Sequence, residues 1–363
     1  MPRANSHEHL TLRLCAVLIL CSGLVGQSVP RTGVLKIVST VRTGEIASSL
    51  VLPAKCDLTG NAWVRVAGDK VGAGPILKIS PDGKKLVRYS LDAIPPEVAS
   101  DARMRSFAPG PGDELVVLLE KQGEETQHYL VRYGSDGELR STSRIEAPLR
   151  PSFVGTFPSG DLLIGGDELP PDPKTLAAGV PTSPNRKGFV GIFNNRGQLL
   201  RRISLKADLK PKEQKSKNPA GDPYIKQDKE YRTAMVLSSA ETSEDGNIYL
   251  TRNAPFGPVH VISSSGTVRK SISLIPPNGA RLSTVKLGGG RLIALYLRDK
   301  PNRQAISEVI LSELNLSNGV KIAEYTHSNF DIGSVLACVA PPIYTFLGAD
   351  KEGHLTVVQT TAE

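Results

Sequence analysis

Aromatic residues are scarce in this chain of 363 residues: they make up 5% of it, and Trp63 is the one tryptophan. Single-stranded nucleic acid is commonly bound by stacking its bases on aromatic side chains. The formal net charge of +8 is a modest excess for a chain of this length, and it bears on solubility more than on a particular partner. We therefore expect no nucleic-acid partner.

Recognisable catalytic and metal-binding motifs are missing as well. The sequence contains no His-Glu-x-x-His, Cys-x-x-Cys or Gly-x-Ser-x-Gly motif, and no phosphate-binding loop that ends in Gly-Lys-Ser or Gly-Lys-Thr. Gly72 and Gly74 are not followed by the third glycine and the helix that a dinucleotide site requires. The sequence by itself identifies no reaction.

Long hydrophobic runs are absent apart from Leu14–Val25, which follows a weakly basic start and precedes small residues up to Ser28. About twelve apolar residues are too few to span a bilayer as a permanent helix, and the arrangement is typical of an export signal. We expect residues 1–28 to be a signal peptide and the protein to be secreted or periplasmic, with no stable membrane insertion. A retained membrane anchor and lipid attachment at Cys21 are the alternatives.

Cysteine is rare, and two of the four cysteines, Cys15 and Cys21, lie in the expected signal. The other two, Cys56 and Cys338, would be exposed to an oxidising compartment, which favours one disulfide between them. Spacing alone does not establish the geometry of a bridge, so two unpaired buried cysteines are the alternative.

Glycines that mark turns are plentiful, and they form two alternating series of six. The first series is Gly60, Gly112, Gly160, Gly246, Gly289 and Gly353, and the second is Gly44, Gly83, Gly137, Gly197, Gly266 and Gly319. Short aliphatic runs lie between them, such as AWVRV with ILKI and NIYLTR with VHVIS. Pairs such as Asp82-Gly83 tolerate the positive φ of tight hairpins, so we interpret their carboxylates as turn formers and not as calcium ligands.

Six repeats of four short strands predict an all-β fold, a six-bladed β-propeller over residues 34–360. The segment Val34–Pro53 is similar to Val259–Pro277, which we expect to form an outer hairpin in its own repeat. Ile343–Thr360 looks like an inner hairpin with nothing after it. We therefore expect the last blade to be closed by N-terminal outer strands and C-terminal inner strands.

The segments ISPDGKKLVRY and SEDGNIYLTR each combine an apolar strand with an Asp-Gly turn, and in this the chain resembles bacterial six-bladed propellers of the NHL-repeat type. The resemblance covers nearly the whole chain after the expected signal, and it implies a fold more than an activity. A lyase of that type would bring several histidines to one metal. Four histidines remain outside the signal, which argues against the lyase: His128, His260, His327 and His354.

Two insertions, residues 168–188 and 206–235, interrupt the repeat, and both join strand types whose loops emerge on the same face of a propeller. Long loops either carry function or are solvated segments without a special role. On the first alternative, the protein is a non-catalytic binding or scaffold module for an unknown protein or small-molecule partner, acting through this face without a cofactor. The candidate binding residues are Asp167, Glu168, Arg252, Asn253, Arg298 and Asp299.

An enzyme is the alternative hypothesis. Propeller enzymes assemble their sites from residues on several blades, so a missing local motif does not exclude catalysis. A lactonase-like, metal-dependent hydrolase would gather carboxylate and amide oxygens at the central channel, and such ligands suit calcium.

Overall fold

The structure is a computed structural model. It describes residues 29–46, 50–67, 74–123, 126–168, 188–205, 237–252, 258–299, 306–328, 332–333 and 335–363. The expected signal peptide lies outside these residues, as do the two insertions apart from Glu168 and Gly188, so those predictions stay untested. No helix in the described ranges is both long enough and apolar enough to cross a membrane.

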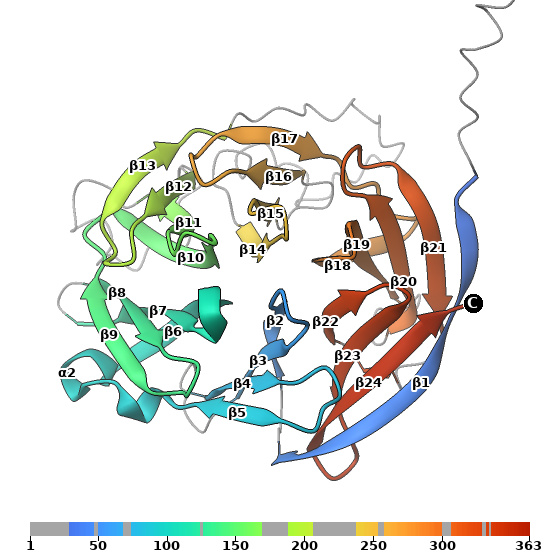
Figure 1. The fold of residues 1–363 in the computed structure, drawn as a ribbon, viewed down its shortest axis with the longest axis horizontal. Coiled ribbons are helices and arrows are strands. Elements are labelled where there is room, and N and C mark those ends of the chain that lie inside the picture. Colours follow the sequence, from blue (N-terminus) through green and yellow to red (C-terminus); the bar gives the residue numbers. More distant parts are fainter. Residues whose placement is uncertain are drawn as a thin grey trace, which may run out of the picture.

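The strands are arranged radially as the blades of a ring, with β2, β6, β10, β14, β18 and β22 nearest the axis (Figure 1). Blade 1 contains β2 (Leu50–Cys56), β3 (Ala62–Val66), β4 (Ile76–Ile79) and β5 (Leu86–Tyr89). Blade 2 contains β6 (Ala102–Pro109), β7 (Leu115–Lys121), β8 (Gln127–Tyr133) and β9 (Leu139–Arg144). Three short helical turns belong to this part of the chain: η1 (Leu91–Ala93), α2 (Pro96–Ala99) and η2 (Pro111–Asp113).

Blades 3 and 4 continue the same four-stranded meander. Blade 3 contains β10 (Leu149–Thr156), β11 (Leu162–Glu168), β12 (Gly188–Phe193) and β13 (Leu199–Ile203). Blade 4 contains β14 (Leu237–Thr242), β15 (Ile248–Arg252), β16 (Val259–Ile262) and β17 (Val268–Ile272).

Blades 5 and 6 together form one eight-stranded sheet. Blade 5 contains β18 (Ala280–Gly288), β19 (Arg291–Asp299), β20 (Ile306–Asn315) and β21 (Lys321–His327). Blade 6 contains β22 (Val335–Ala340), β23 (Ile343–Ala349), β24 (His354–Ala362) and, outermost, β1 (Arg31–Ile46). The two blades are joined because the first residues of β1, Arg31–Val34, pair in parallel with Ala323–Thr326 of β21. The predicted six-bladed propeller is confirmed.

The two ends of the chain share the last blade, as predicted, but they divide it as one strand plus three. β1 alone comes from the N-terminal segment and pairs antiparallel with β24. Gly44 lies within β1 and closes no hairpin, because the next strand, β2, is already the innermost strand of blade 1. Gly353 lies in the turn between β23 and β24, so the hairpin between the first two strands of this blade closes at Pro341-Pro342 instead.

The core consists of six hydrophobic clusters, one between each pair of neighbouring blades. Each inner strand is covered on both faces, which explains continuous apolar runs in place of an alternating pattern. In β7, for example, Leu115, Val117 and Leu119 pack toward blade 1, whereas Val116 and Leu118 pack toward blade 3. The packing of each blade therefore depends on both of its neighbours.

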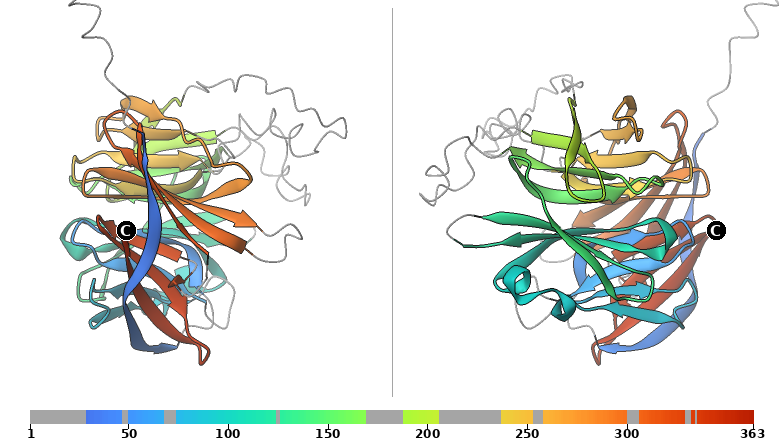
Figure 2. Two further views of the ribbon diagram at one scale, coloured as in Figure 1. Left: turned by 90° about the vertical axis from the view of Figure 1, so that its right-hand side faces the viewer. Right: turned by 60° about the vertical axis from the view of Figure 1, so that its left-hand side comes forward.

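The meander gives the ring two different faces, seen from the side in Figure 2. We call the face that carries the hairpins between first and second strands, such as the one at Gly60, the turn face. The opposite face carries the connections from second to third strands, and β11 ends and β12 begins there. We call it the insertion face, because both insertions leave the propeller on that side.

A disulfide joins the first blade to the last. Cys56 at the end of β2 is bonded to Cys338 in β22, with their Cα atoms 5.1 Å apart and a sequence separation of 282. The predicted pairing is confirmed. Because these two strands are both innermost, the bond links neighbouring blades at the point where the ring closes.

Replacing both Cys56 and Cys338 with alanine should lower the free energy of unfolding by about 4 kcal/mol, because the bond restricts a very long loop in the unfolded chain. Urea unfolding of the oxidised protein and the double variant measures the difference. A double variant as stable as the oxidised protein would contradict a stabilising role for this bond.

Candidate functional site

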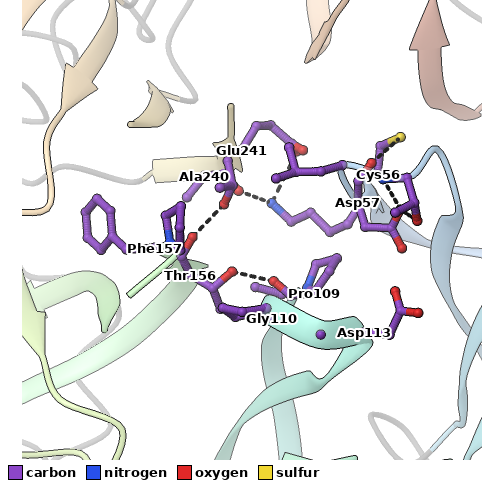
Figure 3. A pocket seen from close by; sticks show the side chains of 17 residues that line it. Cys56, Asp57, Pro109, Gly110, Asp113, Thr156, Phe157, Ala240 and Glu241 are labelled. Carbon is purple, nitrogen blue, oxygen red and sulfur yellow. Dashed lines mark hydrogen bonds and ion pairs between the residues drawn. The ribbon is translucent and has the colours of Figure 1, made fainter. Parts of the chain in front are cut away.

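A pocket of about 300 Å³ opens on the turn face. It is lined by the ends of innermost strands and the turns that follow them in blades 1 to 4, residues 55–59, 108–113, 156–158 and 240–242. In Figure 3, Thr156 and Phe157 lie on one side of the pocket, and Cys56 and Asp57 lie on the other. The ring thus brings segments that are far apart in sequence to a single site.

The carboxylate of Asp57 has a structural role in the pocket wall. Its oxygens accept hydrogen bonds from the backbone N–H groups of Thr59 and Asn61, at 3.0 and 2.9 Å, and from Trp63 Nε1 at 2.8 Å. Burial by itself raises the pKa of Asp57, but the hydrogen bonds from Trp63, Asn61 and Thr59 outweigh it and lower the pKa below its usual value. This carboxylate therefore holds the turn.

Two threonines join blades 2, 3 and 4 along another part of the wall. The hydroxyl of Thr156 donates to the carbonyl of Pro109, and the hydroxyl of Thr242 donates to the carbonyl of Thr156 at 2.7 Å. These bonds run from one innermost strand to the next, so they hold the wall in one shape.

The base of the pocket is formed by a buried group of three charges, Lys55, Glu241 and Lys286, which are 2%, 4% and 0% exposed. They come from innermost strands of blades 1, 4 and 5, so they meet across the axis of the ring. The Oε1 atom of Glu241 lies 3.3 Å from Lys55 Nζ and 3.1 Å from Lys286 Nζ. Lys55 and Glu241 also line the pocket, which places this ionic group at its base.

Further hydrogen bonds complete the group. Lys55 Nζ donates to Ser239 Oγ at 3.0 Å and to the carbonyl of Ala240 at 2.7 Å, and Lys286 Nζ donates to the carbonyl of Ala54. Ser239 Oγ donates to Glu241 Oε1 at 2.7 Å. Glu241 Oε1 therefore accepts three hydrogen bonds, whereas Oε2 accepts none from the described residues.

The two lysines keep Glu241 ionised. Burial alone raises the pKa of Glu241, but the attraction of Lys286 and Lys55 and the hydrogen bonds outweigh it, so the pKa lies below its ordinary value. Burial lowers the pKa of Lys55, and although Glu241 opposes this effect, Lys286 adds to it. The pair of ammonium groups is thus tolerated at the axis because one carboxylate lies between them.

Many of the residues that line the pocket are apolar: Leu58, Ala108, Pro109, Pro111, Phe157, Pro158 and Ala240. A concave, mainly apolar site with a few fixed polar groups is the usual form of a small-ligand site. Among the described residues, no group of three or more His, Cys, Asp or Glu side chains is placed to hold a metal ion.

The described residues among those predicted to bind from the sequence lie on the insertion face. Asp167 and Glu168, Arg252, and Arg298 with Asp299 stand at the insertion-face ends of β11, β15 and β19, while Asn253 lies outside the described residues. The described ion pairs of this set stay within single blades: Glu168 with Arg202, Arg298 with Glu308, and Asp299 with Arg281. None of these described ion pairs joins two of the candidates, and their binding of a ligand stays a prediction.

The charged base of the pocket escaped the sequence analysis, although a signal for it is present. Lys55, Glu241 and Lys286 each interrupt an apolar or small-residue strand shortly before a hairpin turn, in PAKC, SAETS and TVKLG. A charge at that position of an innermost strand points to the axis, where it needs a partner of opposite sign. Which strands meet there becomes clear only from the closed ring.

Solved structures of similar shape include a streptogramin B lyase, with 10% identity, a TM-score of 0.46 and coverage of 91% of this chain and 98% of that chain. A luciferin-regenerating enzyme has 13% identity, a TM-score of 0.48 and coverage of 91% and 95%. YCF48 bound to a D1 peptide has 10% identity, a TM-score of 0.42 and coverage of 93% and 100%.

The fold is a β-propeller. No protein-family model and no curated protein sequence matches this propeller chain. At identities of 13% or less, the similarities above do not extend to activity or ligand.

The substitution Glu241→Gln should lower the free energy of unfolding by about 3–5 kcal/mol, because it leaves two buried ammonium groups without a compensating charge. Urea unfolding at pH 7 measures the loss. The matched control is Glu352→Gln, which removes an ion pair with Arg42 from a side chain that is 69% exposed. Glu352→Gln should lower the free energy of unfolding by less than about 1 kcal/mol.

The effect of Glu241→Gln should also depend on pH. Because the folded-state pKa lies below the unfolded value, the carboxylate contributes stability that is complete above the ordinary pKa of 4.5 and is lost as the pH falls through the folded value. The difference between wild type and variant should therefore narrow toward pH 3. A constant difference from pH 7 to pH 3, or none at pH 7, would contradict the ionised group.

Proposed function

We propose that the protein is an exported, non-catalytic binding module and that the pocket on the turn face is its ligand site. The observation that carries this proposal is a cavity of about 300 Å³ whose base is an ordered ionic group. Four blades contribute to its walls, which are tied together by side-chain hydrogen bonds. A site fixed in this way binds a ligand with little loss of conformational entropy.

The lining suggests the chemistry of the ligand. Leu58 and the prolines of the wall favour a compact apolar group. Glu241 lines the pocket, and its Oε2 atom accepts no hydrogen bond from the described residues, so it offers an acceptor. Because the two lysines already exceed the charge of Glu241 by one positive charge, a neutral N–H or O–H donor suits this acceptor better than a cation.

The proposal also includes the export signal, the domain bounds and the partner surface that the sequence predicts. Residues 1–28 serve as the export signal, and residues 34–360 form the propeller domain, of the NHL-repeat-like type. The disulfide between Cys56 and Cys338 supports an oxidising compartment. The segments 168–188 and 206–235 supply a further surface for a partner, consistent with a scaffold role.

The alternative of a metal-dependent hydrolase has no specific observation in its favour. The carboxylates that line the pocket already have internal partners: Asp57 holds its turn, Asp113 pairs with Lys78 at 2.9 Å, and Glu241 pairs with two lysines. A calcium-dependent reaction is therefore not part of the proposal.

The proposal predicts that the purified protein binds indole, a compact apolar molecule with one N–H donor, more tightly than 1-methylindole, which lacks that donor. Ligand-detected NMR titration measures both dissociation constants. The variant Leu58→Arg, at the rim of the pocket, should weaken indole binding at least about fourfold, which corresponds to the loss of roughly one methylene group of apolar contact.

Leu200→Arg is the matched control, because Leu200 and Leu58 are each 56% exposed and Leu200 lies on β13, away from the pocket. Its affinity for indole should equal that of the wild type. Equal weakening by both variants, or no binding of indole at all, would refute the pocket as the ligand site. Equal binding of indole and 1-methylindole would refute the role of the Glu241 acceptor.

A further inference from the structure

A second group of charged residues lies on the insertion face, at the junction of blades 2 and 3. Its centre is Glu120, near the end of β7, with a side chain that is 1% exposed. Arg150 of β10 donates from Nε to Glu120 Oε2 at 3.0 Å and from Nη2 to Oε1 at 3.3 Å. His128 Nε2 lies 3.4 Å from the same Oε2. The buried carboxylate thus holds Arg150 in a fixed orientation.

Arg105 joins this group with part of its guanidinium unused. Its Nε lies 3.4 Å from Glu120 Oε2, and within the described part of the chain its two terminal nitrogens have no hydrogen-bond partner. The side chain is 30% exposed, so a ligand can reach it. Arg105 is the extra residue where the pairing of β6 with β7 shifts, between Met104 and Ser106, and such a bulge redirects a side chain.

Arg103, opposite Glu120 in the pairing of β6 with β7, adds a third guanidinium near Arg105. It lies two residues before Arg105 on β6, it is exposed, and no ion pair to it is found among the described residues. Burial lowers the pKa of Arg105, and although Glu120 raises it, Arg150 and Arg103 lower it further. Arg150 and Arg103 are therefore each close enough to Arg105 to repel its positive charge.

The charges of the group do not cancel. Arg105 and Arg150 pair with the carboxylate of Glu120, Arg103 lies opposite Glu120 in the pairing of β6 with β7, and Asp167 is near Arg105. Burial raises the pKa of Glu120, but hydrogen bonds from His128 and Arg150 outweigh it and lower the pKa to about 2, so this carboxylate stays ionised. Counted over these five described side chains, one positive charge is left over, which matches a group with a single negative charge.

We propose that Arg103, Arg105 and Arg150 form a binding site for a carboxylate group. The planar guanidinium of an arginine can donate two parallel hydrogen bonds to the two oxygens of a carboxylate. In Arg105 the two terminal nitrogens can make these bonds, because Nε faces Glu120 and the ion pair holds the guanidinium in place. The carboxylate belongs either to a small organic acid or to an acidic side chain of a peptide. This site is independent of the pocket, because it lies on the opposite face of the ring.

Isothermal titration calorimetry at constant ionic strength tests this site on the intact protein. The probes are succinate and acetyl-Glu-Glu-Glu-amide, and both should bind. Arg105→Gln and Arg103→Gln should each weaken binding at least about tenfold, the effect of losing one charge-assisted hydrogen bond. Arg103→Gln removes no ion pair and no side-chain hydrogen bond within the described residues, so it separates loss of binding from loss of folding.

The control is Arg140→Gln on the same blade, where Arg140 pairs with Asp136 at the surface. It should leave both affinities within about twofold of the wild type, a difference well under 1 kcal/mol. Tighter binding of the peptide than of succinate would identify an acidic segment as the source, and equal binding would identify a small acid. Wild-type affinity in both test variants, no binding of either probe, or tenfold tighter binding of inorganic phosphate would overturn the carboxylate site.

Discussion

The antiparallel pairing of β1 with β24 is the interaction on which the rest of this structure depends. It joins residues from the two ends of the chain, Leu35–Ile46 with His354–Ala362, and so completes the sixth blade. Every hydrophobic cluster lies between two neighbouring blades, so each blade needs a neighbour on both sides. Closure of the ring therefore determines whether all six clusters are complete.

Closure also creates the polar interior of the ring. Lys55, Glu241 and Lys286 are separated by long stretches of sequence, and they meet because their innermost strands face a common axis. Burying three charges is unfavourable unless each has a partner, and the hydrogen bonds to Ser239 and Ala240 supply what the ion pairs leave unmet. This arrangement fixes one relative placement of blades 1, 4 and 5. The pocket, which Lys55 and Glu241 line, is therefore held in one shape as well.

The sequence was informative about the fold because its turn glycines repeat at regular intervals, and Cys56 and Cys338 could be paired because they are the two cysteines outside the expected signal. It was misleading about the last blade, since the apolar Leu50–Pro53 resembles an outer strand and forms part of the innermost β2. The pocket on the turn face was not predicted, because the two long insertions indicated a functional surface on the insertion face. Contacts between innermost strands have no local signature, so Glu241 could not be paired with its lysines in advance.

The central claim, that β1 completes the ring, is tested most directly by hydrogen–deuterium exchange on a chain that lacks residues 31–46. The account predicts that the amides of β24 lose their protection, and that the loss extends to β22 and β23 and to the cluster between blades 6 and 1, because this blade then lacks its outer strand. Protection of β24 equal to that in the intact protein would contradict the account.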